Sequence, residues 1–218
     1  MVNNYFKGRL LGDFIFFPFF TFDLELDIDL LKFNNILNIM FSKKSDFFAK
    51  LIPINNKING NLKININEIA STSNVINSGN AELEFVNGIL KAKNIQLNMN
   101  KIGAINLNGA FLKKKNKKLF VFDGLINISN SDVFYSRFLI PKQSRKPLKP
   151  INLTGKIDLQ TSEIKLDKMY FNNKTEDELR DDKLETLNEN INEIFLQNSL
   201  ENILRYSNLR KIIQSFFN

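Results

Sequence analysis

The chain has 218 residues in globular proportions, with 43% hydrophobic and 24% charged, which argues against a disordered protein. It contains no Cys and no His, so disulfides, thiolate metal sites, imidazole bases and a Ser-His-Asp triad are excluded. The net charge of +7 is compatible with nucleic acid or an anionic membrane, but the Lys residues are spread over turns and strand faces and no nucleic-acid-binding motif is present. We therefore favour a solvated basic surface and expect no nucleic-acid partner.

The N-terminal region holds an apolar stretch followed by an alternating one. FIFFPFF at residues 14–20 is too short for a spanning helix, contains Pro18 and precedes no signal-peptide cleavage site. FDLELDIDL at residues 22–30 alternates apolar and acidic residues, which predicts a half-buried strand with an acidic solvent face. The chain thus shows no export signal of its own, which leaves a cytoplasmic protein or a piece of a longer exported one.

The middle of the chain changes period twice. Apolar residues at helical spacing predict a helical segment at about 31–50, which ends before Pro53. From residue 59 to 171 the period of two returns and predicts a series of strand hairpins. Residues 137–150 hold three of the five prolines and predict an extended connection or exposed loop.

The register of one hairpin follows from its turn. In ELEFVNGILKAK, at residues 82–93, Asn87-Gly88 is the preferred pair for a two-residue turn in which both residues need positive φ. This turn predicts the pairs Val86–Ile89, Phe85–Leu90, Glu84–Lys91, Leu83–Ala92 and Glu82–Lys93. Beyond Lys93 the apolar phase moves from even to odd positions, so we expect a β-bulge near Lys93-Asn94.

A second hairpin is predicted at residues 151–171. A turn at Thr161-Ser162 would give the pairs Leu159–Ile164, Asp158–Lys165, Ile157–Leu166 and Lys156–Asp167. As in the first hairpin, apolar residues would then share one face and opposite charges the other. Agreement of apolar and charge pairing in both hairpins favours an antiparallel β assignment.

The C-terminal region returns to helical spacing. Thr175 and Glu178 form a capping box. Two apolar stripes follow, with a break expected near Asn198 or at Ser207-Asn208: Leu184, Leu187, Ile191, Ile194 and Phe195, then Leu200, Ile203, Leu204, Leu209, Ile212, Ile213, Phe216 and Phe217. The second stripe carries Arg205, Arg210 and Lys211, so it suits either a membrane-surface helix or a helix packed on the sheet, and both alternatives stay open.

The charged clusters each have a functional and a structural interpretation. The acidic face of 23–29 lacks a base or metal-binding partner, and no carboxylate pair across a cleft can be identified, so we expect a solvated strand and no enzyme, metal or cofactor. KKKNKK at residues 113–118 could touch lipid headgroups or phosphates, but we favour a solubilising turn. The basic residues of 137–149 are interpreted as a solvated loop.

The strands present more apolar surface than the predicted helices can cover. The sheet must close on itself or leave an apolar groove, which would suit an acyl chain, and from the residues alone these alternatives are equal. We predict that such a groove is lined by Leu62, Ile64, Ile66, Leu83, Phe85, Leu90, Ile95, Leu97, Ile105, Leu107, Phe120, Phe122, Ile126, Ile128, Ile157 and Leu159.

The order of the strands resembles a known family. GNLKINI, GNAELEFVNGIL and IGAINLNG, with Gly60, Gly79, Gly88, Gly103 and Gly109, are similar to the C-terminal region of AsmA-like proteins (AsmA, TamB and YhdP), which are related to bridge-like lipid-transfer proteins. The resemblance covers roughly residues 20 to 170. It implies a curved, gutter-shaped antiparallel sheet that carries phospholipid acyl chains at the periplasmic face of a Gram-negative envelope. Family members usually begin with an inner-membrane helix, so we expect a fragment of a longer, anchored protein.

Together these observations predict a mainly β fold with α caps: a long curved antiparallel sheet, forming a groove or half-open barrel, with C-terminal helices. We expect a β-groove domain at residues 1–173 and a helical appendage at 174–218. The predicted function is phospholipid binding and transfer, or outer-membrane biogenesis, without catalysis. The alternative is a structural or assembly module that binds another envelope protein through its sheet edges or C-terminal helices. Outer-membrane barrel strands are disfavoured by the helical C-terminus and the many Lys on strand faces.

Overall fold

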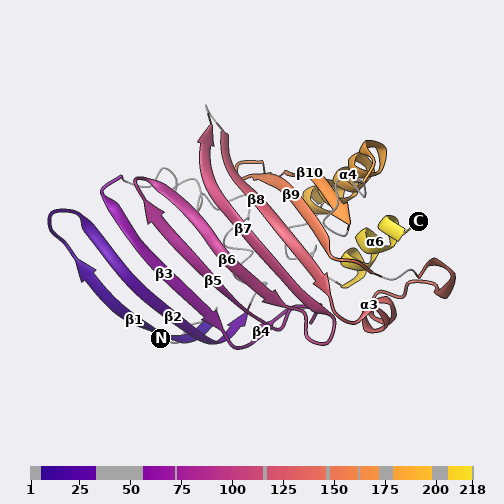
Figure 1. The fold of residues 1–218 in the computed structure, drawn as a ribbon, viewed down its shortest axis with the longest axis horizontal. Coiled ribbons are helices and arrows are strands. Elements are labelled where there is room, and N and C mark those ends of the chain that lie inside the picture. Colours follow the sequence, from indigo (N-terminus) through magenta and orange to yellow (C-terminus); the bar gives the residue numbers. More distant parts are fainter. Residues whose placement is uncertain are drawn as a thin grey trace.

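A computed structural model describes residues 6–32, 56–71, 73–114, 117–145, 148–161, 163–171, 179–197 and 206–217. Its main feature is one open, curved sheet of ten strands with helices at one end (Figure 1). The strands are β1 (Phe6–Ile15), β2 (Phe20–Lys32), β3 (Ile58–Ile66), β4 (Ile69–Ala70), β5 (Ser78–Val86), β6 (Ile89–Asn98), β7 (Gly103–Lys114), β8 (Lys117–Ile128), β9 (Ile151–Asp158) and β10 (Ile164–Phe171). The mainly β fold with C-terminal helices confirms the sequence-based prediction.

The sheet follows chain order from β1 to β10, with short β4 paired to β2. Its long strands are antiparallel except at one place, where β2 and β3 run parallel in an unbroken register from Phe20–Ile58 to Ile28–Ile66. The prediction of a uniformly antiparallel sheet is therefore wrong at this pair. A parallel pair needs a crossover of a dozen or more residues, and the chain between β2 and β3 is long enough to provide one.

The N-terminal part of the chain holds one strand that was not predicted and one predicted helical segment that lies largely outside the described residues. Strand β1 was not predicted, because its residues alternate poorly: Leu10 and Leu11 are adjacent and Gly8 and Gly12 interrupt the pattern. The helical segment expected at about 31–50 falls largely on residues 33–50, which lie outside the described part of the chain. Leu31 and Lys32, at its start, belong to β2.

The β5–β6 hairpin forms as predicted. All five cross-strand pairs from Val86–Ile89 to Glu82–Lys93 are present, and Asn87 and Gly88 have φ of 49° and 80°. The predicted bulge also forms, since the β6–β7 register shifts between Ala92 and Ile95 and Asn94 has φ of 48°. The apolar side chains of β6 therefore stay on one face despite the change of phase in the sequence.

The β9–β10 hairpin has a different register from the predicted one. Ile157 pairs with Ile164, Lys156 with Lys165 and Gly155 with Leu166. The turn is longer because the Asp158 carboxylate accepts hydrogen bonds from the backbone N–H groups of Gln160 (3.0 Å) and Thr161 (3.4 Å). Of the predicted charge pairs, Lys156–Asp167 forms at 3.1 Å across a bulge, whereas Asp158 pairs with Lys117 at 3.7 Å.

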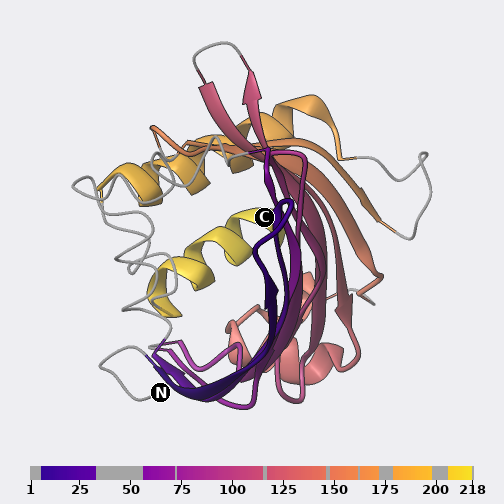
Figure 2. The same cartoon turned by 90° about the vertical axis from the view of Figure 1, so that its left-hand side faces the viewer.

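The described helices cover the concave face of the sheet at one end and along its lower edge (Figure 2). They are α3 (Ser131–Arg137), α4 (Asp181–Gln197) and α6 (Tyr206–Phe217), with a 3-10 turn η1 (Lys142–Ser144). Leu184 and Leu187 of α4 are buried against Leu166 and Met169 of β10. The capping box at Thr175 and Glu178 lies outside the described residues. The end of α4 at Gln197 agrees with the predicted break near Asn198, whereas Ser207-Asn208 lies within α6.

The segment predicted as an extended connection or exposed loop, 137–150, is partly a core element. Asn130 caps α3 by accepting from the N–H of Val133 at 3.0 Å, and Phe138 and Ile140 are buried after it. Arg137 donates to the carbonyl of Ser73 at 2.6 Å, and Arg145 donates to the carbonyl of Ile140 at 3.1 Å. Two basic residues of the segment interpreted as a solvated loop therefore bond to backbone carbonyls of the fold.

Candidate functional site

The concave face of the sheet is covered by apolar rows that run across the strands. Because directly paired residues point to the same side of a sheet, the registers define four rows that each cross the nine long strands. In order from β1 to β10, they are Phe14, Phe22, Gly60, Phe85, Leu90, Phe111, Phe120, Ile157 and Ile164; Gly12, Leu24, Leu62, Leu83, Ala92, Gly109, Phe122, Gly155 and Leu166; Leu10, Leu26, Ile64, Ala81, Ile95, Leu107, Gly124, Leu153 and Met169; Gly8, Ile28, Ile66, Gly79, Leu97, Ile105, Ile126, Ile151 and Phe171.

None of these row positions carries a polar side chain. Every position is aliphatic, aromatic or glycine, so these four rows of the described strands hold no side chain that could act as a base, a nucleophile or a metal ligand. Its chemistry is that of a hydrocarbon surface, and its natural ligands are apolar groups that gain by leaving water.

Aromatic rings are concentrated in the first row, next to the turns at the upper edge of the sheet. Phe22 contacts Phe85 at a centroid distance of 5.2 Å, and Phe111 contacts Phe120 at 4.7 Å. Gly60, which has φ of 155°, leaves room for this arrangement, because a Cβ there would lie 2.7 Å from Cγ of Phe22. The glycine thus lets the Phe22 ring lie over the backbone of β3 and contact Phe85 on β5.

The rows are covered unevenly. α4 and α6 contact β8–β10 through a cluster that includes Phe122, Ile126 and Ile212. α3 and α6 contact the lower edge through a cluster that includes Ile105 and Ile128. In the described residues neither cluster, nor the one around Ile28 and Ile69 at the lower edge of β2–β4, includes the middle of the face, which is formed by Leu62, Leu83, Phe85, Leu97, Leu107 and Phe120. These side chains are half-buried, whereas Leu90 and Ala92 of β6, in the same part of the face, are buried.

The structure brings fifteen of the sixteen predicted groove residues to this one face. The exception is Leu159, which lies in the turn after β9, where its N–H donates to the carbonyl of Lys118 at 2.8 Å. It is not part of a row because β9 ends one residue earlier than the alternation indicates. That these residues bind lipid stays a prediction.

Sequence reasoning missed several members of the rows. Leu10 and Phe14 were missed because β1 was not recognised, and Phe111 and Leu153 were not included although they lie on predicted strands. Ile164 and Leu166 were predicted on the same face as Ile157 but were not included among the groove residues. The alternation of each strand was the available signal, and it would have found all except the β1 pair.

The opposite face of the sheet carries charged side chains, and several of them form ion pairs. Lys91 and Lys93 contact Oε2 of Glu84 at 3.3 and 2.8 Å, and Arg9 contacts Asp27 at 3.6 Å. The hydrogen bond and charge of Lys93 hold the pKa of the Glu84 carboxyl below its usual value. The predicted Glu82–Lys93 neighbours are paired in register, but the Lys93 ammonium reaches Glu84 instead, and Glu82 accepts from the Asn94 amide at 3.0 Å.

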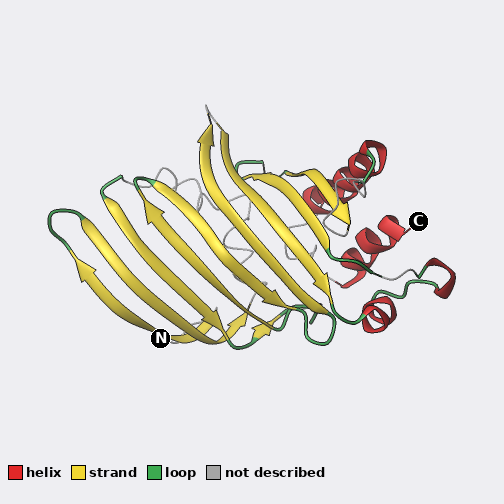
Figure 3. Ribbon diagram, viewed as in Figure 1, coloured by secondary structure: helices red, strands yellow, loops and turns green. Residues whose placement is uncertain are grey.

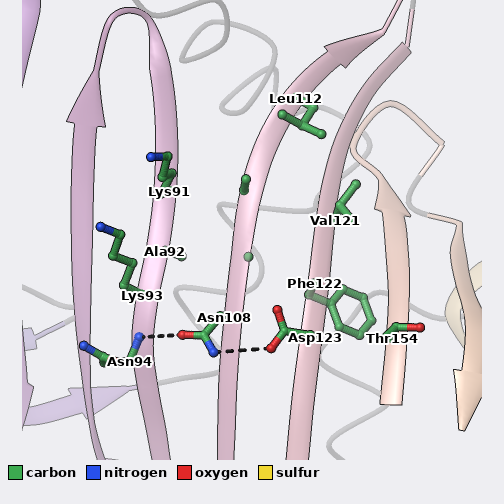
Figure 4. A pocket seen from close by; sticks show the side chains of 12 residues that line it. Lys91, Ala92, Lys93, Asn94, Asn108, Leu112, Val121, Phe122, Asp123 and Thr154 are labelled. Carbon is green, nitrogen blue, oxygen red and sulfur yellow. Dashed lines mark hydrogen bonds between the residues drawn. The ribbon is translucent and has the colours of Figure 1, made fainter. Parts of the chain in front are cut away.

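A shallow depression of about 650 Å³ lies mainly on this polar face, around the β6 bulge (Figure 4). The Asn108 side chain accepts from the N–H of Asn94 at 3.0 Å and donates to Asp123 at 3.3 Å. These polar groups of the depression are therefore hydrogen-bonded to one another. The Asn108 amide oxygen thus satisfies the Asn94 N–H at the bulge. We interpret the depression as a structural feature of the bulge.

The described residues contain no group of three or more acidic side chains that could hold a metal ion. Among the helices of the described ranges, none is both long enough and apolar enough to cross a bilayer. Comparison of the chain with protein-family models, with curated proteins and with solved structures found no match.

Proposed function

We propose that the concave face binds the acyl chains of phospholipids and allows them to slide along the sheet. The observation that carries the proposal is the set of four apolar rows, in which central side chains such as Leu83, Phe85 and Leu107 are half-buried and belong to none of the three buried clusters of the described residues. Burial of apolar surface gives roughly 25 cal/mol per Å², so an acyl chain lying across several rows would gain several kcal/mol.

The mechanism is passive. The four described rows offer no polar side chain to fix an acyl chain at one place, so neighbouring positions along a row have similar affinity and a bound chain can move between them. Headgroups would remain in water at the upper edge of the sheet, where the strands turn. The proposed location is the periplasmic face of an envelope, as part of a longer inner-membrane-anchored protein, and it rests on the resemblance to AsmA-like proteins.

A membrane contact through the C-terminal helix is a weaker element of the proposal. Leu209 and Ile213 of α6 pack against the cluster at the lower edge of the sheet, and Ile212 packs against the β8–β10 cluster. These three side chains therefore face protein in this arrangement and are not available to a bilayer.

Protein assembly is a second candidate, favoured by the exposed apolar residues of β1. Among the described strands β1 forms the end of the sheet, and its Leu11 and Ile15, on the polar-face side, are 56% and 60% exposed. A terminal strand with exposed apolar residues can pair with a strand of another protein. Such a partner would extend the sheet beyond β1.

Transfer of a fluorescent phospholipid from donor to acceptor vesicles tests the proposal. Leu83→Glu places a charge in the centre of the rows and should slow transfer at least about tenfold, because an acyl chain would have to pass a carboxylate in an apolar site. Val121→Glu is the matched control on the opposite face, where the native side chain is already 37% exposed. Transfer by the wild type at the rate of protein-free vesicles would reject the proposal and favour assembly.

A further inference from the structure

The upper edge of the sheet gathers exposed aromatic residues and lysines from different turns. The registers put the β1–β2, β5–β6, β7–β8 and β9–β10 turns on the same side of the aromatic row, and Figure 1 shows them along one edge. We define the turn rim as Phe16, Phe17, Phe19, Lys113, Lys114 and Lys117.

The aromatic part of the turn rim is the most exposed large apolar group described. Phe16 is 68% exposed, Phe17 is 87% exposed and Phe19 is 51% exposed. Contiguous exposed aromatic side chains in a turn are costly in water and mark an interaction surface. Phe16 also contacts Phe20 at 5.5 Å, and Phe20 contacts Phe22 at 5.8 Å, so the turn continues directly into the first aromatic row of the concave face.

The basic part of the turn rim comes from the tip of the β7–β8 hairpin. Lys113, Lys114 and Lys117 are exposed, and the hairpin extends beyond its neighbours (Figure 1). Of these three lysines, Lys117 contacts a described carboxylate, that of Asp158, at 3.7 Å. The rim therefore combines aromatic residues with an excess of positive charge, which complements the interface of an anionic bilayer.

The two long edges of the concave face differ. At the lower edge, α3 and the β6–β7 turn bury Phe134, Ile140 and Met99 in one cluster, and Ile28, Leu31 and Ile69 form another. The upper edge has no such cluster among the described residues. A lipid that enters the concave face from a membrane would therefore enter at the upper edge.

We propose that the turn rim docks on the surface of an anionic phospholipid bilayer, with the β1–β2 turn inserted among the headgroups and the β7–β8 lysines on lipid phosphates. The biological role of docking rests on the proposed acyl-binding function, because docking would explain how lipid reaches the rows. Docking itself is a separate property and is measured separately.

Vesicle flotation tests docking directly. The wild type should bind vesicles of phosphatidylglycerol and phosphatidylcholine, and it should bind pure phosphatidylcholine vesicles more weakly. Phe16→Ser/Phe17→Ser should weaken binding at least about tenfold, because two aromatic rings that the proposal inserts into the bilayer are lost. Lys113→Gln/Lys114→Gln should weaken binding to the anionic vesicles at least about fivefold and leave binding to the neutral ones unchanged.

Matched variants at the other edge control for general stickiness. Leu139 follows α3 at the lower edge and is 52% exposed, so Leu139→Ser removes an exposed apolar side chain away from the rim. Lys101→Gln/Lys142→Gln removes two exposed charges from the same region. Both controls should bind anionic vesicles like the wild type.

Three outcomes would overturn docking by the rim: no binding of the wild type to anionic vesicles, equal losses in the rim and lower-edge variants, or rim variants that bind normally. A Phe85→Glu variant separates the two proposals. If it binds vesicles normally but carries no lipid, both proposals hold. If the wild type binds vesicles but neither carries nor transfers lipid, docking stands and the acyl-binding function fails.

Discussion

Single residues explain how a sheet so rich in aromatic side chains stays regular. Phe22 lies over Gly60, and Phe120 lies over Gly109, where a Cβ would approach the ring closely. A large side chain beside a glycine fills the space that the glycine leaves and protects the backbone from water. The glycines are therefore part of the apolar rows and not only points of flexibility.

We expect Gly60→Ala to lower the free energy of unfolding by roughly 1–3 kcal/mol. The added Cβ would meet the Phe22 ring and backbone, and the φ of 155° at this position disfavours any side chain. Denaturant titration measures the change. Asn61→Ala, at the exposed neighbouring position on the polar face, is the control and should have little effect. Equal stability of Gly60→Ala and the wild type would contradict this role of the glycine.

The Glu84 carboxylate should give a pH-dependent contribution to stability. Lys93 and Lys91 lower its pKa in the folded protein, so the contribution is present above the unfolded-state pKa of about 4.3 and is lost as pH falls through the lower, folded value. Glu84→Gln should therefore reduce stability at about pH 7 but not at about pH 3. Because the pair lies at the surface, the difference at neutral pH should shrink in about 1 M salt. A difference independent of pH would point to packing instead of charge.

At the scale of elements, α4 closes the β10 edge of the sheet by imitating a strand. The Asn188 amide accepts from the N–H of Leu166 at 2.8 Å and donates to its carbonyl at 3.0 Å. Asn192, one helical turn later, makes the same pair of bonds with Ile164. Side chains four apart on a helix are spaced like residues two apart on a strand. Both pairs thus satisfy backbone groups that an edge strand leaves open. Figure 3 shows α4 beside this last strand.

Asn188→Ala should destabilise the protein by about 1–3 kcal/mol, because it leaves two partly buried backbone groups without partners. Amide hydrogen exchange should rise at Leu166 and adjacent positions of β10. Glu189→Ala, on the exposed side of the same helix, should leave both stability and exchange unchanged. If Asn188→Ala and Glu189→Ala behave alike, the asparagines do not protect the edge.

The sequence predicted the elements whose geometry depends on local chemistry. The β5–β6 register was predictable because Asn87-Gly88 permits one type of turn. The β9–β10 register was not, because Thr161-Ser162 imposes no such turn and the Asp158 carboxylate stabilises a longer one. The seven residues of α3 are too few to show a helical period. The parallel β2–β3 pair was missed because alternation shows which face a residue occupies and is blind to strand direction.

The sequence predicted which residues share the apolar face, but it did not predict which parts of that face are covered or where a lipid would enter. Alternation correctly grouped residues such as Leu83, Phe85 and Leu97, because each strand obeys the period of two. The order of the strands and the position of the helices decide which part of the face is covered, and these depend on long-range packing. The exposure of the β1–β2 turn could not be read from FIFFPFF for the same reason.

At the scale of the whole molecule, the fold is an asymmetric gutter. Helices and buried clusters close its lower edge and the β10 end, while the turn rim is exposed and several side chains in the middle of the concave face are only half-buried. The opposite face carries charged side chains, several of which form ion pairs. This separation of an apolar concave face from a polar convex face is the physical basis of the proposed acyl-chain binding.

Native mass spectrometry of the purified protein tests this central claim most directly. The wild type, ionised under mild conditions, should carry adducts with phospholipid masses. Phe85→Glu, in the aromatic row, should lose them, whereas Ile89→Glu, on the polar face of the same hairpin and 42% exposed in the native protein, should keep them. A wild type without lipid adducts after equilibration with phospholipid, or equal lipid occupancy in both variants, would contradict the account.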